Sequence, residues 1–310
     1  MGRVLERLAA SIGVVFGAVT LIFLILNWLP GDPAALIAGD GAAPETIENV
    51  RAQLGLGRPV GVRYVEYLRD LAHGDLGRSY TTREPVARRL AQQFPATAGL
   101  VAAASLIAVV TGVFLGVLSA IKRGTWIERW IQFITVSLFA IPPFWLGLLM
   151  ILVFSVRLRW LPVIGDGGFL PSVLPVACLG IFVSVPLMRI VRQGLLEGLH
   201  EPYVTTLRAK GLGEREIFFV HVLRNALIAT VTLFSVIVGE LLSGAVVVET
   251  LFARQGIGRL AVDAISQKDI PVVQGAILLA SIIFVFMNLI VDLSYPLIDP
   301  RTTLVARGTR

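Results

Sequence analysis

The chain has 310 residues, of which 55% are hydrophobic and 15% are charged, and its formal net charge is +6. Charged residues make up about 25% of an average soluble protein, so this composition excludes an ordinary soluble domain and favours an integral membrane protein. The basic residues do not form one soluble face, which argues against nucleic-acid binding. The single cysteine, Cys178, excludes a disulfide within the chain.

Six apolar segments follow one another along the chain. Five of them contain uncharged windows of more than 20 residues, and the remaining window, 225–248, contains Glu240 as its only charge. About 20 residues cross a hydrocarbon core, and a backbone in lipid must satisfy its own hydrogen bonds, so each segment is predicted to be a helix. The predicted spans are approximately 8–29, 96–120, 130–156, 171–190, 226–248 and 272–293.

The first span is expected to remain in the protein rather than to be removed as a signal peptide. Its apolar run is longer than that of a signal peptide, and it ends in NWLPGDP instead of a small-residue cleavage site.

The distribution of basic residues predicts the side on which each loop lies. With the N-terminus inside the cell, 14 of the 27 Lys and Arg residues fall in cytoplasmic segments and 5 fall in the two short outer loops. The other 8 fall in the long segment 30–95, where the positive-inside rule carries little weight. We therefore expect an all-α integral membrane protein with six transmembrane helices, both termini in the cytoplasm, and an extracytoplasmic segment 30–95.

Segment 30–95 is predicted to contain two short amphipathic helices. Apolar residues recur at helical spacing in APETIENVRAQLGL, where Pro44 suits the start of a helix and Gly55 its end. The same pattern recurs in VRYVEYLRDLAHG and stops at Gly74. These helices fit either a lid that packs on the spans or a docking surface for a partner. Another short surface helix is predicted after Gly256 in the second outer loop.

Two features inside the predicted spans are candidates for a translocation path. Pro142 and Pro143 interrupt the third span, and such prolines are either packing features or sources of hinges and free carbonyl groups beside a path. Glu240 lies in the middle of the fifth span, where a carboxylate costs roughly 2.5–3.5 kcal/mol. Either it faces the path and receives a cationic group, such as a peptide N-terminus, or it makes an interhelical hydrogen bond.

A polar and strongly basic segment separates the fourth and fifth spans. We refer to residues 193–225 as the basic segment. Pro202 suits the start of one short helix that Gly211 ends, and Gly213 suits the start of a second short helix that we expect to end near Arg224. The segment also carries more apolar surface than water tolerates. Its large apolar side chains are Tyr203, Leu207, Ile217, Phe218 and Phe219. A hairpin lying on the membrane surface is one explanation, and a docking surface for another protein is the one we favour.

The basic segment resembles the cytoplasmic loop of ABC importer permeases of the peptide-transporting type. The matching residues are Tyr203, Val204, Thr206, Arg208, Ala209, Lys210, Gly211, Leu212, Glu214, Arg215, His221, Leu223, Arg224, Asn225, Ala226 and Leu227. Further similar motifs follow in the order typical of the family: LPGDPA, GDLGRSY, GAVVVETLF, IPVVQGAILL and VDLSYPLIDPR. The chain is therefore identified as a member of the first-permease type of dipeptide and oligopeptide importers.

The resemblance implies a division of labour among several subunits. This chain would form half of a heterodimeric pore with a second permease, two ATPase subunits would grip the loops of the two permeases, and an extracytoplasmic solute-binding protein would deliver the peptide. The implied ATPase-coupling residues are Tyr203, Arg208, Ala209, Lys210, Gly211, Leu212, Glu214, Arg215 and His221. The implied location is a bacterial or archaeal cytoplasmic membrane. Relatives that import nickel, haem or oligosaccharides leave the cargo open.

No cofactor, metal site or catalytic residue is expected in this chain. It has no GxxxxGK[ST] phosphate loop, so ATP and Mg would bind to the partner subunits. A membrane protease is disfavoured because the sequence has no GxSxG motif and its three histidines lie outside the spans. An ion-coupled secondary transporter is disfavoured because Glu240 and Asp292 are the only acidic residues at or near membrane depth.

Overall fold

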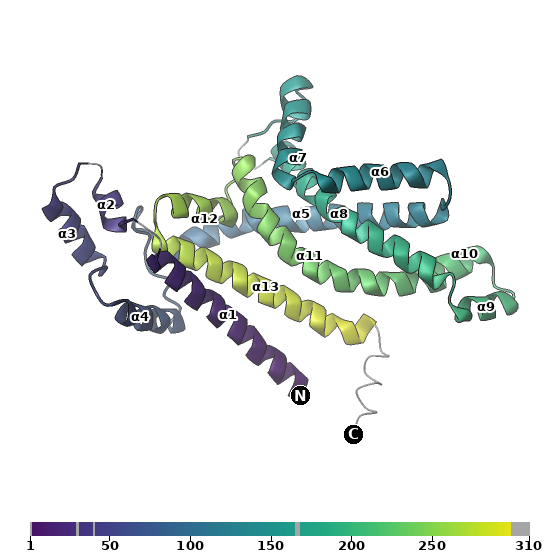
Figure 1. The fold of residues 1–310 in the computed structure, drawn as a ribbon, viewed down its shortest axis with the longest axis horizontal. Helices are drawn as coiled ribbons and strands as arrows, with labels where there is room; N and C mark the ends of the chain where they lie inside the picture. Colours follow the sequence, from purple (N-terminus) through teal and green to yellow (C-terminus); the bar gives the residue numbers. More distant parts are fainter. Residues whose placement is uncertain (1, 29–30, 40, 165–167, 299–310) are drawn as a thin grey trace. The chain divides into compact units, whose positions relative to one another are not determined.

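The computed structural model describes residues 2–28, 31–39, 41–164 and 168–298, and its described regular structure is helical (Figure 1). An isolated β-bridge joins Arg78 to Pro85. The chain divides into two compact units, residues 1–97 with 254–285 and residues 98–253 with 286–310.

The first unit contains the outer segment. Its helices are α1 (Gly2–Trp28), α2 (Pro33–Ala38), α3 (Pro44–Gln53), α4 (Val60–Ala72), α12 (Ile257–Ser266) and the first parts of α5 (Val86–Ile121) and α13 (Ile270–Ile298). The predicted surface helices are confirmed: α3 starts at Pro44, α4 ends just before the Gly74 turn, and Gly256 precedes α12. An apolar core of this unit joins α1, α5, α12 and α13.

The second unit contains the rest of α5 and the helices on either side of the basic segment. These are α6 (Trp126–Ala140), α7 (Pro143–Met150), η1 (Ile151–Arg157), α8 (Phe169–Gly198), α9 (Pro202–Ala209), α10 (Glu214–Glu216), η2 (Ile217–Val222) and α11 (Leu223–Leu251). Helix α8 is central, because α5, α7 and α11 all pack against it in one apolar core. Close packing of α5 on α8 depends on glycine, since a Cβ at Gly112 would lie 2.9 Å from the carbonyl oxygen of Ser184.

Several helices are long and apolar enough to cross a membrane. Four of the described helices satisfy this condition: α1 from Ala10, α5, α8, and α13 as far as Leu289. Helix α6 and the α7–η1 pair add a fifth span if the bent pair counts as one.

The third predicted span is bent rather than straight. Helix α6 stops at Ala140, and the following helix pair leaves at an angle of 105°. Ile141 is extended (φ −86°, ψ 126°) because the residue before a proline is disfavoured in the α region, and Pro142 has no N–H to continue the ladder. The carbonyl oxygen of Pro143 lies 3.5 Å from the Sγ atom of Cys178 on α8. By contrast, Pro175 and Pro186 lie inside α8 without ending it.

Candidate functional site

The basic segment forms a compact turn at one end of the α8–α11 pair. Helices α9 and α10 lie at the end opposite to α7 (Figure 1). The predicted helix at Pro202 is confirmed as α9. The prediction of a second short helix ending near Arg224 is wrong, because α10, η2 and α11 follow one another without a break from Glu214 to Leu251. No glycine or proline interrupts the chain between Glu214 and Val238, so nothing local stops this helix at Arg224.

Gly211 closes the turn between α9 and α10. Its φ of +83° lies in the left-handed region that glycine adopts without strain. The N–H of Gly211 donates to the carbonyl oxygen of Arg208 at 2.9 Å, and the N–H of Leu212 donates to that of Leu207 at 3.3 Å. This pair of hydrogen bonds is a Schellman motif, and the partly buried side chains of Leu207 and Leu212 join the same apolar cluster. The reversal of the chain is therefore set by local backbone chemistry.

The inner face of the turn is apolar and well packed. Val204, Ile217 and Val222 are fully buried in a cluster with Val191 and Leu195 of α8. Of the large apolar side chains that the sequence places in this segment, Ile217 is buried, and Tyr203, Leu207 and Phe218 are half-buried. Of the large apolar side chains of η2, Phe219 (45% exposed) and Val220 (55% exposed) remain outside. The cluster fixes α9 and η2 to the ends of α5, α8 and α11.

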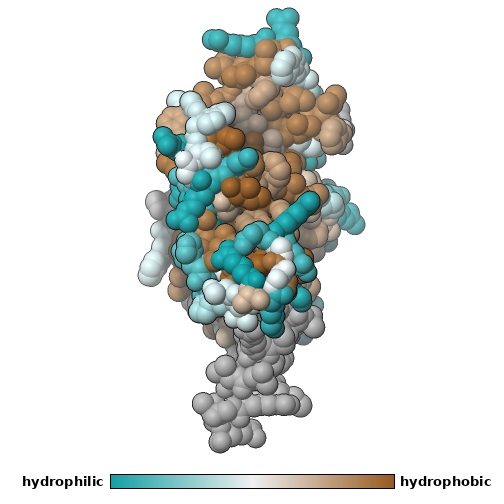
Figure 2. Space-filling model, turned by 90° about the vertical axis from the view of Figure 1, so that its right-hand side faces the viewer, coloured by the Kyte–Doolittle hydropathy of each residue, from teal (hydrophilic) through white to brown (hydrophobic). Residues whose placement is uncertain are grey.

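The outer face of the turn is polar and exposed. Six of the nine predicted coupling residues are exposed: Arg208, Ala209, Lys210, Gly211, Glu214 and Arg215. The other three, Tyr203, Leu212 and His221, are half-buried. Figure 2 looks at the molecule from this side and shows hydrophilic side chains beside apolar surface. We call the six exposed residues the outer face of the basic segment.

An ion pair joins the two sides of the turn. The Nε atom of Arg208 donates to Oε1 of Glu214 at 2.6 Å, and Nη2 donates to Oε2 at 3.1 Å. Hydrogen bonding to Arg208 holds the pKa of Glu214 below its ordinary value, and the same contact raises the pKa of Arg208. Both side chains are exposed, so the pair orients the outer face more than it stabilises the fold.

The turn is also tied to both long helices. A Cβ at Gly198 of α8 would lie 2.9 Å from Cγ1 of Val222, and one at Gly194 would lie 3.1 Å from Cβ of Ala226, so the two helices approach closely here. The amide of Asn225 donates to the hydroxyl of Tyr203 at 3.3 Å. A force on the outer face would therefore reach α8 and α11 through direct contacts.

The sequence did not reveal a second ion pair beside the basic segment. Glu128 of α6 is 7% exposed; its Oε1 accepts from Nε of Arg192 on α8 at 3.1 Å, and its Oε2 accepts from the N–H of Gly124 at 2.6 Å. The only sequence signal is an acidic residue among Lys122, Arg123 and Arg129. The pair connects the α5–α6 turn to the helix that leads into α9.

The first unit contains another polar cluster that the sequence did not reveal. Asp269 is 1% exposed and accepts hydrogen bonds from the hydroxyls of Ser79 and Thr81 and, at 2.9 Å, from the N–H of Tyr80. Arg89 lies 3.7 Å from the same carboxylate. Burial raises the pKa of Tyr80. This cluster joins the GDLGRSY motif to the start of the IPVVQGAILL motif.

The structure describes the candidate path residues only in part. Pro142 and Pro143 form the bend between α6 and α7. Glu240 lies on α11, and its side chain lies outside the described residues. Among the residues that the structure describes, no group of three or more His, Cys, Asp or Glu side chains could hold a metal ion.

Two family models match the chain. Residues 112–304 match the model described as binding-protein-dependent transport system inner membrane component, and residues 1–101 match the N-terminal model of such membrane components. The chain belongs to this family. Its predicted identity as an ABC importer permease subunit is thereby confirmed.

Similar proteins match over nearly the whole chain. A protein of Brucella abortus (strain 2308) named as a peptide transport system permease is 39% identical over 306 residues, which cover 96% of this chain and 98% of the relative. The glutathione transport system permease protein of Escherichia coli (strain K12) is 41% identical over 300 residues, which cover 97% of this chain and 98% of the relative.

Solved transporters share the fold. The inward-facing MetNI methionine ABC transporter superposes with a TM-score of 0.57 at 19% identity, covering 68% of this permease and 96% of that chain. An amino acid ABC transporter crystallised with histidines gives a TM-score of 0.51 at 15% identity, covering 67% and 94%. The helical architecture is thus that of an ABC transporter permease.

Proposed function

We propose that this permease forms half of the translocation path of an ATP-driven peptide importer in a bacterial or archaeal cytoplasmic membrane. The assignment of a peptide cargo rests on sequence identities of 39% and 41%, over nearly the full length, to permeases named for peptide and glutathione transport. Glutathione is itself a tripeptide. Importers of nickel, haem or oligosaccharides are the alternative cargo classes.

The proposed topology has six membrane helices with both termini in the cytoplasm. In chain order, the six spans are α1, α5, the bent α6–α7–η1 segment, α8, α11 and α13. Segment 30–95 would lie outside and the basic segment, residues 193–225, inside. The excess of basic residues in the segments assigned to the cytoplasm supports this orientation.

The proposed role of the basic segment is to couple the permease to an ATPase subunit. Its outer face offers Arg208, Lys210 and Arg215 to a partner, while its inner face is packed onto the ends of α5, α8 and α11. An exposed rigid turn that is fixed to several helices suits the transmission of movement. ATP and Mg would bind to the two ATPase subunits, a second permease would complete the path, and a solute-binding protein would deliver cargo to the outer side.

Pro142, Pro143 and Glu240 remain the candidates for the path. The bend at the two prolines supports this role, because a broken helix leaves backbone carbonyl groups without helical donors. Glu240 would receive a cationic group of the peptide.

The experiment that tests the function uses the complete transporter in proteoliposomes with ATP inside and the solute-binding protein outside. Uptake of labelled di- and tripeptides is expected, whereas nickel, haem and oligosaccharide uptake would contradict the cargo assignment. Arg215→Glu is expected to reduce uptake while the complex still assembles, because it reverses a charge on the outer face. Uptake and stimulated ATP hydrolysis at wild-type levels in this variant would contradict the coupling role.

A further inference from the structure

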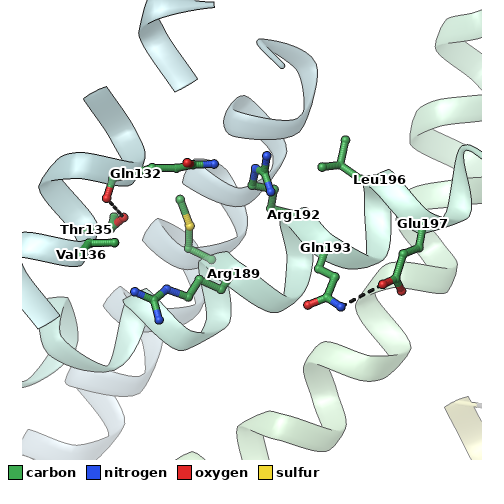
Figure 3. A pocket seen from close by; sticks show the side chains of 9 residues that line it. Gln132, Thr135, Val136, Arg189, Arg192, Gln193, Leu196 and Glu197 are labelled. Atoms are coloured by element: carbon green, nitrogen blue, oxygen red, sulfur yellow. Dashed lines mark hydrogen bonds between the residues drawn. The ribbon is translucent and has the colours of Figure 1, made fainter. Parts of the chain in front are cut away.

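A cavity of about 510 Å³ lies between α6 and α8, beside the basic segment but not on its outer face. Polar side chains of both helices line it, among them Gln132 of α6 and Arg189, Arg192 and Gln193 of α8 (Figure 3). None of the predicted coupling or path residues whose side chains the structure describes lines this cavity.

Arg189 is the charged side chain of the cavity that is available to bind a ligand. Its guanidinium carbon lies 5.4 Å from the ring centre of Phe139, which in turn stacks on Phe182 at 5.3 Å. Among the described residues no carboxylate lies within 4.0 Å of this guanidinium group. A ring face holds a cation in place without neutralising it, so Arg189 can still bind an anion.

One acidic residue, Glu197, lines the cavity, and a second, Glu128, contacts the lining residue Arg192. Glu128 binds Nε and Nη2 of Arg192, which leaves Nη1 of that arginine without a hydrogen bond to the described part of the chain. Glu197 accepts from the amide of Gln193 at 2.8 Å. Lys122 and Arg123, which are exposed in the α5–α6 turn, add further positive charge. The lining itself contains two arginines and one glutamate, and this excess of basic side chains favours an anionic ligand.

Exposed aromatic side chains place the Gln132 side of the cavity near the lipid headgroups. Trp126 is 68% exposed and Trp130 is 53% exposed on the first turns of α6, and Phe133 is 64% exposed one turn further on. Exposed tryptophans mark the membrane interface, and apolar side chains beyond them face acyl chains. Gln132 lies between these residues along the same helix.

We propose that this cavity binds the phosphate group of an anionic phospholipid, with Arg189 as the principal contact. Nη1 of Arg192 and the amide of Gln132 are the additional donors, and an acyl chain follows the exposed side of α6 past Phe133. Basic pockets between membrane helices are suited to such headgroups, and the volume is in the range of ligand sites. This inference does not depend on the cargo or on the coupling role of the basic segment.

The test measures lipid retained by the complete transporter in nanodiscs of phosphatidylcholine with or without phosphatidylglycerol, by native mass spectrometry. Arg189→Gln is expected to weaken phosphatidylglycerol binding about fivefold, since a basic residue near a lipid surface contributes about 1 kcal/mol. Arg189→Lys is expected to retain most of the binding. Arg129→Gln is the control, because it removes the same charge from an exposed position of α6 outside the cavity, and it is expected to change binding little.

Three results would overturn the proposal. Equal losses in Arg189→Gln and Arg129→Gln would show a general charge effect rather than a site. Unchanged lipid binding in Arg189→Gln, with or without a loss of uptake, would mean that the cavity serves cargo or another subunit. Displacement of the retained lipid by inorganic phosphate at comparable concentration would mean that the site takes a free anion.

Discussion

Replacing Gly211 by alanine should loosen the turn at the centre of the basic segment. The residue has a φ of +83°, and no atom lies within 4 Å of the position that a Cβ would occupy, so the substitution strains the backbone without a steric clash. The left-handed conformation costs an L-residue about 1–2 kcal/mol. Lower chain entropy in the open state of the alanine variant offsets about 0.4–1 kcal/mol of this. The remaining cost is about 1 kcal/mol, which corresponds to a roughly fivefold larger open fraction.

Hydrogen exchange measures this opening directly. In the wild type the N–H groups of residues 211 and 212 donate to the carbonyl oxygens of Arg208 and Leu207. In Gly211→Ala both amides should exchange about fivefold faster, because exchange through local opening follows the open fraction. Gly211→Asn is the control, since asparagine tolerates the left-handed region, and its exchange should stay close to that of the wild type. Equal exchange rates in the wild type and the alanine variant would refute the argument that this φ controls the turn.

Three further predictions concern the rest of the structure. Glu128→Gln should lower the free energy of unfolding by roughly 1.5–3 kcal/mol at neutral pH, because Arg192 loses the carboxylate that accepts its hydrogen bonds. Thermal unfolding in detergent measures this cost, and a melting temperature equal to that of the wild type would contradict it. Asp269→Asn should make the outer segment more sensitive to trypsin. Asp263→Asn is the control, because the Asp263 side chain is 56% exposed, and it should not change the sensitivity. Equal sensitivity of the two variants would argue against the buried cluster. Gly112→Ala should destabilise the protein by roughly 1–3 kcal/mol, because the new Cβ would overpack the contact between α5 and α8. Gly99→Ala should not, because no atom lies within 4 Å of the position of its Cβ. The reverse order of stabilities would contradict the packing.

Local backbone signals in the sequence were sufficient to predict where the short helices begin or end. Pro44 and Pro202 each occupy the first position of a helix, and Gly211 has the positive φ that ends α9. These residues act through their own backbone geometry, so their effect does not depend on distant parts of the chain. The central reversal of the candidate site was predictable for this reason.

The extent of the helix after this reversal was not predictable in the same way. A boundary near Arg224 was expected because a basic residue in the last turn complements the helix dipole. Charge does not end a helix, however, and the backbone continues from α10 through η2 into α11. Similarly, Pro142 and Pro143 predicted an interruption, but the angle of 105° depends on how α7 packs against α8 and α11.

The polar clusters lay beyond sequence reasoning because their members are far apart in the chain. Arg192 and Glu128 are 64 residues apart, and Ser79 and Asp269 are 190 residues apart. Periodicity and spacing report only on neighbours within a helix, whereas these pairs form when separate helices pack.

Site-specific cross-linking from the outer face tests the coupling role most directly. Lys210→Cys in a Cys178→Ala background places one thiol on the exposed turn between α9 and α10, and Val65→Cys places one on α4 as a control, where the native side chain is 65% exposed. With a short thiol-to-amine reagent in the complete transporter, residue 210 is predicted to link to an ATPase subunit in an ATP-dependent manner, and residue 65 is not. Linkage of residue 65 to the ATPase, or of residue 210 to the solute-binding protein, would contradict both the topology and the coupling role.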